Sequence, residues 1–499
     1  MLRKTSSLML CLIILLSFLL LFSSQWILST FGSVTTEEII FNMLVPQVGA
    51  SSSIVKDFIM KVIPLCLLFS TVLYFIIVKD KNVIIELNIR IKNLNAKKVI
   101  FPFSNIIKII LITIIFAFSI NYSFNRLGLY DYIENQKNTS LLIEEEYVEP
   151  KETSISFENG KRNLIYIFLE SMEASYTSID NGGTQPYNLI EGLTKLSNEN
   201  ISFSNTDKLG GGLSVPGTTW TVAGLVSQTS GLPLKLSIDG NTYGKYNTFL
   251  PGAYTLGDIL NENGYNQEII MGSDSSYAGR NHYFTSHGNY KIFDVNTAIE
   301  NSKMTSDEKV WWGFEDKNLF EWAKEELTLL AHEDAPFNFT ILTADTHFED
   351  GYLSNECNIK YDDQYSNVIS CSSDMVYEFV KWVQAQDFYE NTTIVISGDH
   401  LTMDYDFFAE IDSSYVRTIY NVFINSAVNT DNINNRIFTS MDLFPTTLAS
   451  MGAKIEGDIL GIGTNLFSDK QTLAEIYGIE KLREELTKNS QFYNKKILY

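Results

Sequence analysis

The first quarter of the chain holds three long apolar runs, each of which predicts a membrane-spanning helix. The runs are Leu8–Leu28, Val62–Val78 and Asn105–Tyr122, and Lys108 is the only charged residue inside them. A helix of about 20 apolar residues crosses the ~30 Å hydrocarbon core of a bilayer. A cleaved signal peptide is the alternative for the first run, since Arg3 and Lys4 precede it. That run is longer than the apolar core of such a peptide, and no small-residue cleavage site follows it.

Basic residues beside these runs predict how they are oriented. The N-terminus carries Arg3 and Lys4, and residues 79–104 carry six basic side chains: Lys79, Lys81, Arg90, Lys92, Lys97 and Lys98. Residues 29–58 carry one lysine and three acidic side chains. The positive-inside rule therefore predicts a multi-pass membrane protein with a cytoplasmic N-terminus and an extracytoplasmic chain after Tyr122.

From Asn163 onward, apolar runs alternate with amphipathic segments, which is typical of βαβ units and of an α/β fold with a mainly parallel sheet. Strands are predicted at Leu164–Leu169, Gln267–Met271, Phe337–Leu342, Thr393–Ile396 and Arg417–Ile424. Helices are predicted at Trp220–Gln228, at Asn318–Leu330, at Asp374–Gln386 with Ser372 or Ser373 as the cap, and at Met441–Met451 with an interruption at Pro445. We expect a membrane domain (1–123), a linker (124–161), an extracytoplasmic domain (162–470) and a helical tail (471–499).

The charge of the chain is unevenly distributed. The 499 residues carry a net charge of −22. Residues 1–123 contain eleven basic and five acidic side chains, whereas the remaining residues contain 26 basic and 54 acidic ones. This acidic excess argues against a nucleic-acid partner, because phosphate backbones select basic surfaces.

The four cysteines fall into two pairs. Cys11 and Cys66 lie inside predicted membrane spans, where a thiol acts as a small apolar side chain. Cys357 and Cys371 lie in the external domain with a polar segment between them, and in an oxidising compartment they predict a disulfide. Two free thiols are the alternative, because spacing alone does not prove pairing.

Acidic and imidazole side chains follow two of the predicted strands directly. Glu170 ends the strand in Asn163–Ser171, and Asp399 and His400 follow the strand in Thr393–His400. Ligands at the carboxyl ends of neighbouring strands are how an open α/β sheet builds a metal site, and this donor set suits Mn, Zn or Fe. The alternatives are a capping or ion-paired acid for Glu170, and a capping acid beside a surface histidine for Asp399 and His400.

The segment 210–220 (GGGLSVPGTTW) is rich in glycine and leads into an apolar helix. A hydroxyl there would lie at the positive end of the helix dipole, beside free backbone N–H groups that bind phosphate oxygens. Metal coordination would lower the pKa of that hydroxyl further. Thr218 and Thr219 are therefore candidate nucleophiles, and the alternative is that either residue only caps the helix.

Two further residues could contact a phosphate group. Arg280 has the bidentate fork of a phosphate clamp, although a lone loop arginine is commonly solvated. His347 lies five residues beyond a predicted strand and could donate a hydrogen bond to a phosphoryl oxygen or protonate a leaving alkoxide. Asp345 could instead pair with His347 in a structural role.

Taken together, these segments resemble the membrane-bound phosphoglycerol transferase branch of the alkaline phosphatase/sulfatase superfamily. The resemblance covers about residues 160–470 and depends on five motifs: FLES at Phe168–Ser171, GTTWTVAGLVSQTSGLPL at Gly217–Leu234, DTHFEDGY at Asp345–Tyr352, SGDHLTM at Ser397–Met403 and DLFPT at Asp442–Thr446. It implies an alkaline-phosphatase-like three-layer α/β/α domain behind transmembrane helices.

The resemblance also implies roles for single residues. Glu170, Asp399 and His400 match the metal ligands of the family, with Mn²⁺ expected and Mg²⁺ or Zn²⁺ as alternatives. Thr218 matches the nucleophile, which also touches the metal, and Thr219 is the alternative if the register differs by one. Arg280 and His347 match residues that hold the substrate's phosphoglycerol group.

The implied activity is transfer of a glycerophosphoryl group from phosphatidylglycerol to a glycan, a teichoic-type polymer or a glycolipid at the membrane. Phosphoethanolamine transfer and phosphodiester hydrolysis are alternatives within the same superfamily. A catalytically silent membrane receptor or scaffold is the alternative from another class of protein.

Overall fold

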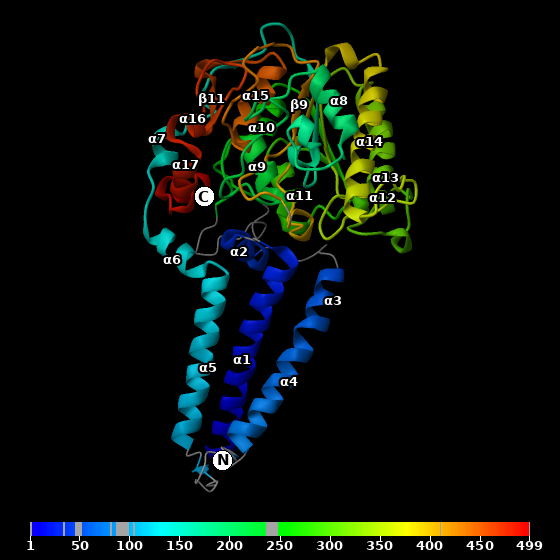
Figure 1. Ribbon diagram of the computed structural model, residues 1–499. Helices are drawn as coiled ribbons and strands as arrows, with labels where there is room; N and C mark the ends of the chain where they lie inside the picture. Colours follow the sequence, from blue (N-terminus) through cyan, green and yellow to red (C-terminus); the bar gives the residue numbers. More distant parts are fainter. Residues whose placement is uncertain are drawn as a thin grey trace. The chain divides into compact units, whose positions relative to one another are not determined.

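The computed structural model describes residues 2–32, 35–44, 52–79, 82–85, 99–102, 105–235, 248–409 and 411–498 (Figure 1). The chain forms two compact units. Unit 1 comprises Met1–Thr36 and Ser51–Ile133, and unit 2 comprises Glu37–Ala50 and Glu134–Tyr499. Unit 2 therefore includes a short stretch that precedes the second apolar run in the sequence.

Unit 1 consists mainly of apolar helices. They are α1 (Leu2–Phe31), α3 (Ser52–Lys61), α4 (Ile63–Leu73), which continues into a π-helical turn (Tyr74–Lys79), and α5 (Asn105–Arg126). Three stretches are long and apolar enough to cross a membrane: Leu8–Phe31, Ile54–Ile76 and Ile106–Arg126. Large apolar side chains such as Leu67 and Phe118 are more than half exposed, which is expected of a surface that faces lipid. The three predicted apolar spans are thus present as helices.

The core of unit 2 is a six-stranded sheet in the order β6-β5-β7-β4-β8-β9. The strands are β4 (Asn163–Leu169), β5 (Asn266–Met271), β6 (Lys291–Phe293), β7 (Phe337–Leu342), β8 (Thr392–Gly398) and β9 (Asn421–Ile424). All neighbours pair in parallel except β8 and β9, which are antiparallel. The mainly parallel sheet confirms the predicted α/β class. The three-residue strand β6 was not predicted, and β9 is shorter than the predicted Arg417–Ile424.

Both faces of this sheet are covered by helices. Leu164, Tyr166 and Phe168 of β4 point into one hydrophobic core, and the alternate residues Ile165, Ile167 and Leu169 point into another. Because successive side chains of a strand project to opposite faces, a strand buried along its whole length needs a layer on each side. The sequence of β4 is accordingly apolar from Leu164 to Leu169, whereas β7 and β8 also bury polar side chains such as Asn338 and Thr393.

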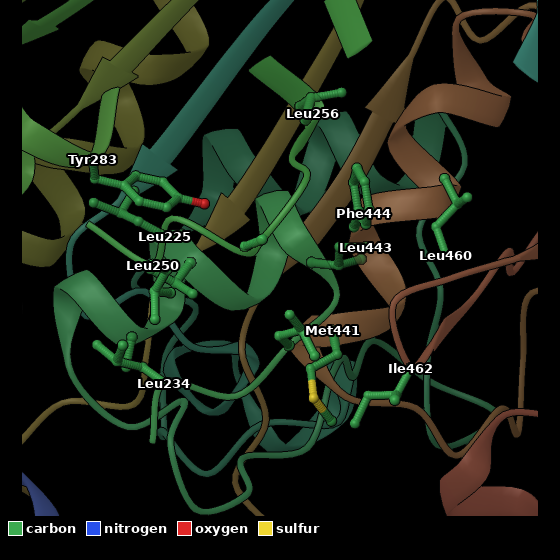
Figure 2. Close-up of a cluster of buried hydrophobic side chains, with 14 of the residues drawn as sticks. Leu225, Leu234, Leu250, Leu256, Tyr283, Met441, Leu443, Phe444, Leu460 and Ile462 are labelled. Atoms are coloured by element: carbon green, nitrogen blue, oxygen red, sulfur yellow. The ribbon is translucent and has the colours of Figure 1, made fainter. Parts of the chain in front are cut away.

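The first core lies under α9 (Thr221–Ser230), α10 (Leu256–Glu262), α15 (Leu443–Ser450) and α17 (Ile479–Thr487). Figure 2 shows part of this core, in which Leu225, Leu256, Tyr283 and Phe444 are among the labelled side chains. The second core lies under α8 (Glu191–Glu199), α12 (Val295–Glu300), α13 (Asp316–Leu330) and α14 (Gln364–Gln384). The predicted three-layer α/β/α arrangement is confirmed.

Two predicted helices differ in detail. Helix α14 starts at Gln364 rather than Asp374, and its cap is Asp363, whose carboxylate accepts hydrogen bonds from the backbone of Tyr365 and Ser366. Ser372 and Ser373 are instead buried within the helix. Pro445 does not interrupt α15, because it lies in the first turn, where a missing N–H breaks no helical hydrogen bond.

The predicted linker and tail contain ordered structure, which belongs to unit 2 from Glu134 onward. In the linker region, α6 (Leu129–Lys137) and α7 (Leu142–Glu146) precede β3 (Ile155–Ser156), which pairs with β10 (Lys454–Ile455). In the tail, α16 (Leu473–Tyr477) and α17 are followed by a π-helical turn (Tyr493–Ile497), and Tyr493 and Ile497 are buried in the first core. A further short strand pair joins β11 (Ile459–Leu460) to β12 (Gly463–Thr464). Cys357 and Cys371 form the predicted disulfide, with their Cα atoms 5.5 Å apart.

Candidate metal and phosphate site

Three candidate metal ligands meet at the carboxyl ends of β4 and β8. The two strands are parallel neighbours, and Leu169 is in register with Gly398, so Glu170 and Asp399 begin side by side. The ligand atoms of Glu170, Asp399 and His400 all lie within 4.8 Å of one another, and all three side chains are buried. Nε2 of His400 lies 3.2 Å from Oε1 of Glu170 and 3.5 Å from Oδ2 of Asp399. The structure thus brings together the three residues predicted from the two strand ends.

The remaining polar atoms of these side chains are held in place by neighbouring groups. Nδ1 of His400 lies 2.8 Å from the carbonyl oxygen of Leu401, which leaves Nε2 facing the carboxylates. Oδ1 of Asp399 accepts hydrogen bonds from the backbone N–H groups of Ser171 and His400. Oδ2 of Asp399 is buried and has no hydrogen-bond partner among the described residues. A buried carboxylate oxygen in this state is what a cation ligand requires, so the three residues fit a divalent metal ion.

The charges of the cluster agree with this interpretation. Burial, together with the negative charge of Glu170, raises the pKa of Asp399 to about 8. The two carboxylates raise the pKa of His400 to about 10, although burial opposes that shift. Two buried carboxylates this close repel each other strongly unless a positive charge lies between them. A divalent cation would supply that charge and favour the ionised acids and the neutral imidazole.

The threonine beside the cluster is Thr221. Its hydroxyl donates a hydrogen bond to Oε2 of Glu170 at 3.2 Å and lies 3.4 Å from Nε2 of His400. Thr221 is the first residue of α9, so its hydroxyl also lies at the positive end of a helix dipole.

Thr218 occupies a different position. Its hydroxyl donates to the carbonyl oxygen of Val215 at 2.9 Å and accepts from the N–H of Val215 at 3.1 Å, so it closes the turn before α9. In the part of the chain that the structure describes, Thr221 rather than Thr218 contacts two of the candidate metal ligands, so Thr221 becomes our candidate nucleophile. The hydroxyl of the alternative, Thr219, is buried without a hydrogen-bond partner in the part of the chain that the structure describes. The predicted helix start near Trp220 was the signal that could have identified Thr221.

Close packing fixes α9 against the loop that carries the ligands. A Cβ atom on Gly224 would lie 2.2 Å from the carbonyl oxygen of Asp399, so only glycine allows this approach. One turn further along, Nε2 of Gln228 donates to the carbonyl oxygen of Gly398 at 2.9 Å. These two contacts hold the N-terminus of α9, and with it Thr221, beside the ends of β4 and β8.

Arg280 and His347 lie near the same cluster. Arg280, at the start of α11 (Arg280–Ser286), is buried, and its guanidinium donates to the carbonyl oxygens of Tyr277 and Asp274. The charge of Glu170 acts on Arg280, and the charges of Glu170, His400 and Arg280 act on His347. Burial lowers the pKa of His347, so the ring is neutral near pH 7. With its Nδ1 2.8 Å from the carbonyl oxygen of Phe348, the neutral ring has its lone pair on Nε2.

A pair of buried acids that the sequence did not reveal positions the loop of His347. The carboxylate of Asp316 accepts hydrogen bonds from the backbone of Ala344 and Asp345, and Asp345 in return accepts one from the backbone of Asp316. Burial and the neighbouring Asp316 raise the pKa of Asp345 to about 10. The hydroxyl of Thr346 donates to the carbonyl oxygen of Glu170 at 2.6 Å, which joins this loop to the metal-ligand cluster.

The fold and the cluster at its strand ends define a sulfatase-like α/β protein. The chain belongs to the sulfatase family, whose family model matches residues 162–453, more than half of the chain. This confirms the resemblance to the alkaline phosphatase/sulfatase superfamily.

Relatives with curated names carry the comparison further. Phosphoglycerol transferase I of Salmonella choleraesuis (strain SC-B67) is 30% identical over 340 residues, which cover 66% of this chain and 42% of that protein. The protein of the same name from Citrobacter koseri is 30% identical over 336 residues, with the same coverage. The chain thus spans less than half the length of these relatives.

Solved structures share the fold at lower identity. The lipoteichoic acid synthase LtaP from Listeria monocytogenes is 17% identical, with a TM-score of 0.50, over 66% of this chain and 82% of that one. The integral membrane lipooligosaccharide phosphoethanolamine transferase A (EptA) from Neisseria meningitidis is 12% identical, with a TM-score of 0.53, over 90% of this chain and 84% of that one.

Proposed function

We propose that this protein is a membrane-bound, metal-dependent transferase that moves a glycerophosphoryl group from phosphatidylglycerol to a hydroxyl of a cell-envelope glycan, polymer or glycolipid. The observation that carries the proposal is the hydroxyl of Thr221, which contacts both Glu170 and His400 at the N-terminus of α9. The relatives named phosphoglycerol transferase I support the choice of the transferred group.

Glu170, Asp399, His400 and Thr221 would hold one divalent ion. Two carboxylates, one imidazole and one hydroxyl suit Mn²⁺ best, with Mg²⁺ and Zn²⁺ as alternatives. A bound ion of this kind lowers the pKa of the threonine hydroxyl and stabilises the negative charge that develops on the phosphoryl oxygens.

The reaction would proceed in two displacements. In the first, Oγ1 of Thr221 forms a bond to phosphorus, the bond from phosphorus to the diacylglycerol oxygen breaks, and the threonine proton ends on the released diacylglycerol. In the second, an acceptor hydroxyl attacks the same phosphorus, the bond to Oγ1 breaks, and the acceptor proton returns to Thr221.

Arg280 and His347 would serve both steps. The buried guanidinium of Arg280 is held by backbone carbonyls and can donate to the phosphoryl oxygens. Nε2 of the neutral His347 can take up the hydroxyl proton and release it to the leaving oxygen. The acceptor step therefore needs no further titratable group.

We place the reaction outside the cytoplasm. The predicted charge bias gives this orientation, and the disulfide of Cys357 and Cys371 is typical of an oxidising compartment. The membership of Glu37–Ala50 and Glu134–Tyr499 in one compact unit supports the same topology. With three spans, the loop after the first span and the chain after the third lie on the same side of the membrane.

Mass analysis of the purified full-length protein tests the proposal. After incubation with phosphatidylglycerol and Mn²⁺, the protein should gain the mass of one glycerophosphoryl group, and peptide mapping should assign that group to Thr221. Thr221→Ala should show no such group, whereas Thr218→Ala, the matched control, should still acquire it.

Other outcomes identify the competing functions. A group mapped to Thr218 would refute the assignment of Thr221. An aminoethyl phosphate acquired from phosphatidylethanolamine would indicate phosphoethanolamine transfer. Release of free glycerophosphate with no transfer to any acceptor would indicate a phosphodiesterase. Protein that binds no metal and acquires no group would fit the silent receptor or scaffold.

A further inference from the structure

Helix α2 (Thr36–Leu44) directly follows the first membrane span in the sequence, yet its residues from Glu37 onward belong to unit 2. Phe41 is 1% exposed and is part of the first hydrophobic core. Its ring lies 5.5 Å from that of Trp220, the residue before Thr221. The helix is therefore packed against the start of α9, where the proposed nucleophile lies.

A second contact joins α2 to the residues around the phosphate. The hydroxyl of Tyr277 donates to Oδ1 of Asn42 across a long 3.4 Å. The guanidinium of Arg280 lies 5.6 Å from the centre of the Tyr277 ring, on its face. The ring of Trp312 lies 5.5 Å from Tyr277 on one side and 4.7 Å from His347 on the other. Tyr277 thus connects α2 with both candidate phosphate-binding residues.

Glu38 is the acidic residue that α2 brings to this region. It is one turn before Asn42 on the helix and is 5% exposed. The charge of His400 acts on Glu38, and Tyr277 is influenced by both Glu38 and Glu170. The cluster of ligand atoms within 4.8 Å of one another does not include Glu38. Glu38 and Asn42 are four residues apart, so they lie on the same face of α2, the face that contacts Tyr277. Glu38 therefore lies on the side of α2 that faces the candidate phosphate-binding residues, outside the set of metal ligands.

We propose that Glu38 binds the hydroxyl groups of the glycerol that is transferred, so that α2 forms part of the donor site and selects the headgroup. This inference rests on the proposed function. A carboxylate accepts hydrogen bonds from two neighbouring hydroxyls, and such charge-assisted bonds are stronger in a buried site than in water. Phe41 and Asn42 would act as positioning residues, because they fix the helix through Trp220 and Tyr277.

A purely structural role for Glu38 predicts a different result. If Glu38 only helped α2 to dock, its substitution would slow all substrates equally. If it binds glycerol, its substitution should affect phosphatidylglycerol more than a phosphodiester without glycerol. The ratio of kcat/KM for phosphatidylglycerol to kcat/KM for bis(p-nitrophenyl) phosphate separates these roles, because a general loss of folded or metal-loaded enzyme cancels in it.

The experiment uses the full-length protein in mixed micelles with Mn²⁺. Glu38→Gln should lower the ratio about tenfold or more, the effect expected for a lost hydrogen bond to a charged group. Glu37→Gln is the matched control: it removes the same charge one position away, where Glu37 interacts with Lys235, and should leave the ratio unchanged. Glu38→Asp keeps the charge but shortens the side chain by one methylene group, so it should lower the ratio to a smaller extent. This variant serves as the test if Glu38→Gln does not fold.

The outcomes separate this inference from the proposed function. A ratio in Glu38→Gln equal to that of the natural protein, or equally lowered in Glu37→Gln, overturns the role of Glu38 and leaves the proposed function intact. A natural protein that hydrolyses bis(p-nitrophenyl) phosphate but does not use phosphatidylglycerol refutes the proposed function, and this inference with it.

Discussion

Replacing Gly224 by alanine should damage the metal-ligand cluster through a single methyl group. The new Cβ would lie 2.2 Å from the carbonyl oxygen and 2.8 Å from the carbonyl carbon of Asp399, whereas ordinary contacts begin at 3.4 Å. Both neighbours are backbone atoms, so α9 and the ligand loop must separate by about 1 Å. A displacement of about 1 Å in a catalytic arrangement can lower activity about 100-fold.

The stability of the variant should change much less. Alanine in the middle of a helix is favoured over glycine by about 1 kcal/mol, whereas overpacking of a core costs about 1–3 kcal/mol. The two effects oppose each other, so we expect the free energy of unfolding to fall by about 0–2 kcal/mol. The predicted result is a folded protein with kcat/KM lowered about 100-fold and weaker metal binding.

Gly192 of α8 provides the matched control. A Cβ there would lie 2.8 Å from Cβ of Tyr377 and 2.9 Å from the carbonyl oxygen of Ser373, at a helix contact that includes none of the candidate metal ligands. Gly192→Ala should therefore lose a similar amount of stability while kcat/KM stays unchanged. The assays are steady-state kinetics, Mn²⁺ titration and thermal unfolding. If Gly224→Ala kept the natural kcat/KM and metal affinity, the close packing of α9 against Asp399 would not be what positions Thr221.

Three further predictions concern Thr218, the divalent ion and Asp345. Thr218→Ala should lower the free energy of unfolding by about 1 kcal/mol in denaturant titrations, because its hydrogen bonds to Val215 are lost. The variant should keep most of its activity, and a loss of activity as large as that of Thr221→Ala would contradict this prediction. Removal of the ion with EDTA should lower the Tm, and Mn²⁺ should restore it in a concentration-dependent way; an unchanged Tm would count against the metal site. Burial and the neighbouring Asp316 raise the pKa of Asp345 to about 10 from the ordinary aspartate value of 3.8, so the contribution of this group to stability is fully present below pH 3.8 and is lost as the pH rises towards 10. The Tm of Asp345→Asn, compared with that of the natural protein, should therefore increase as the pH is raised from about 4 towards 10. A difference in Tm that stays constant over this pH range would refute the raised pKa of Asp345.

The parts of this protein that could be predicted from sequence are those fixed by periodicity. Strands β4 and β8 are buried on both faces and each contains an apolar run of at least three residues. The carboxyl ends of these runs locate Glu170 and Asp399 without any knowledge of the tertiary structure. The predicted start of α14 is too late. Ser372 and Ser373 are common capping residues, but the stripe of apolar residues continues before them, and the true cap at Asp363 depends on backbone geometry.

The threonine of the candidate site shows the same limit on a smaller scale. Thr218 and Thr221 are three residues apart, and both belong to a segment that predicts a helix start. The sequence does not show that the hydroxyl of Thr218 is occupied by the backbone of Val215, a contact that depends on the turn before α9. The hydrogen bond from Thr221 to Glu170 shows which threonine reaches that carboxylate, and the packing of Gly224 on Asp399 holds α9 in the position that allows it.

Helix α2 is the part of the proposed donor site that lies furthest in sequence from the metal ligands, and no sequence motif predicted it. Glu38 lies in a short polar interval after the first apolar run, and a reading based on charge assigns that interval only to one side of the membrane. The helix that carries Glu38 is amphipathic. Its apolar side chain Phe41 is buried in the first hydrophobic core, most of which comes from residues after Glu134. Because Phe41 packs on Trp220 and Asn42 contacts Tyr277, the residues that would bind the donor headgroup come from segments before and after the second and third apolar helical stretches. A protein expressed without the first 50 residues of the chain would therefore keep the metal ligands and Thr221, but it would lack Glu38, which we assign to recognition of the glycerol.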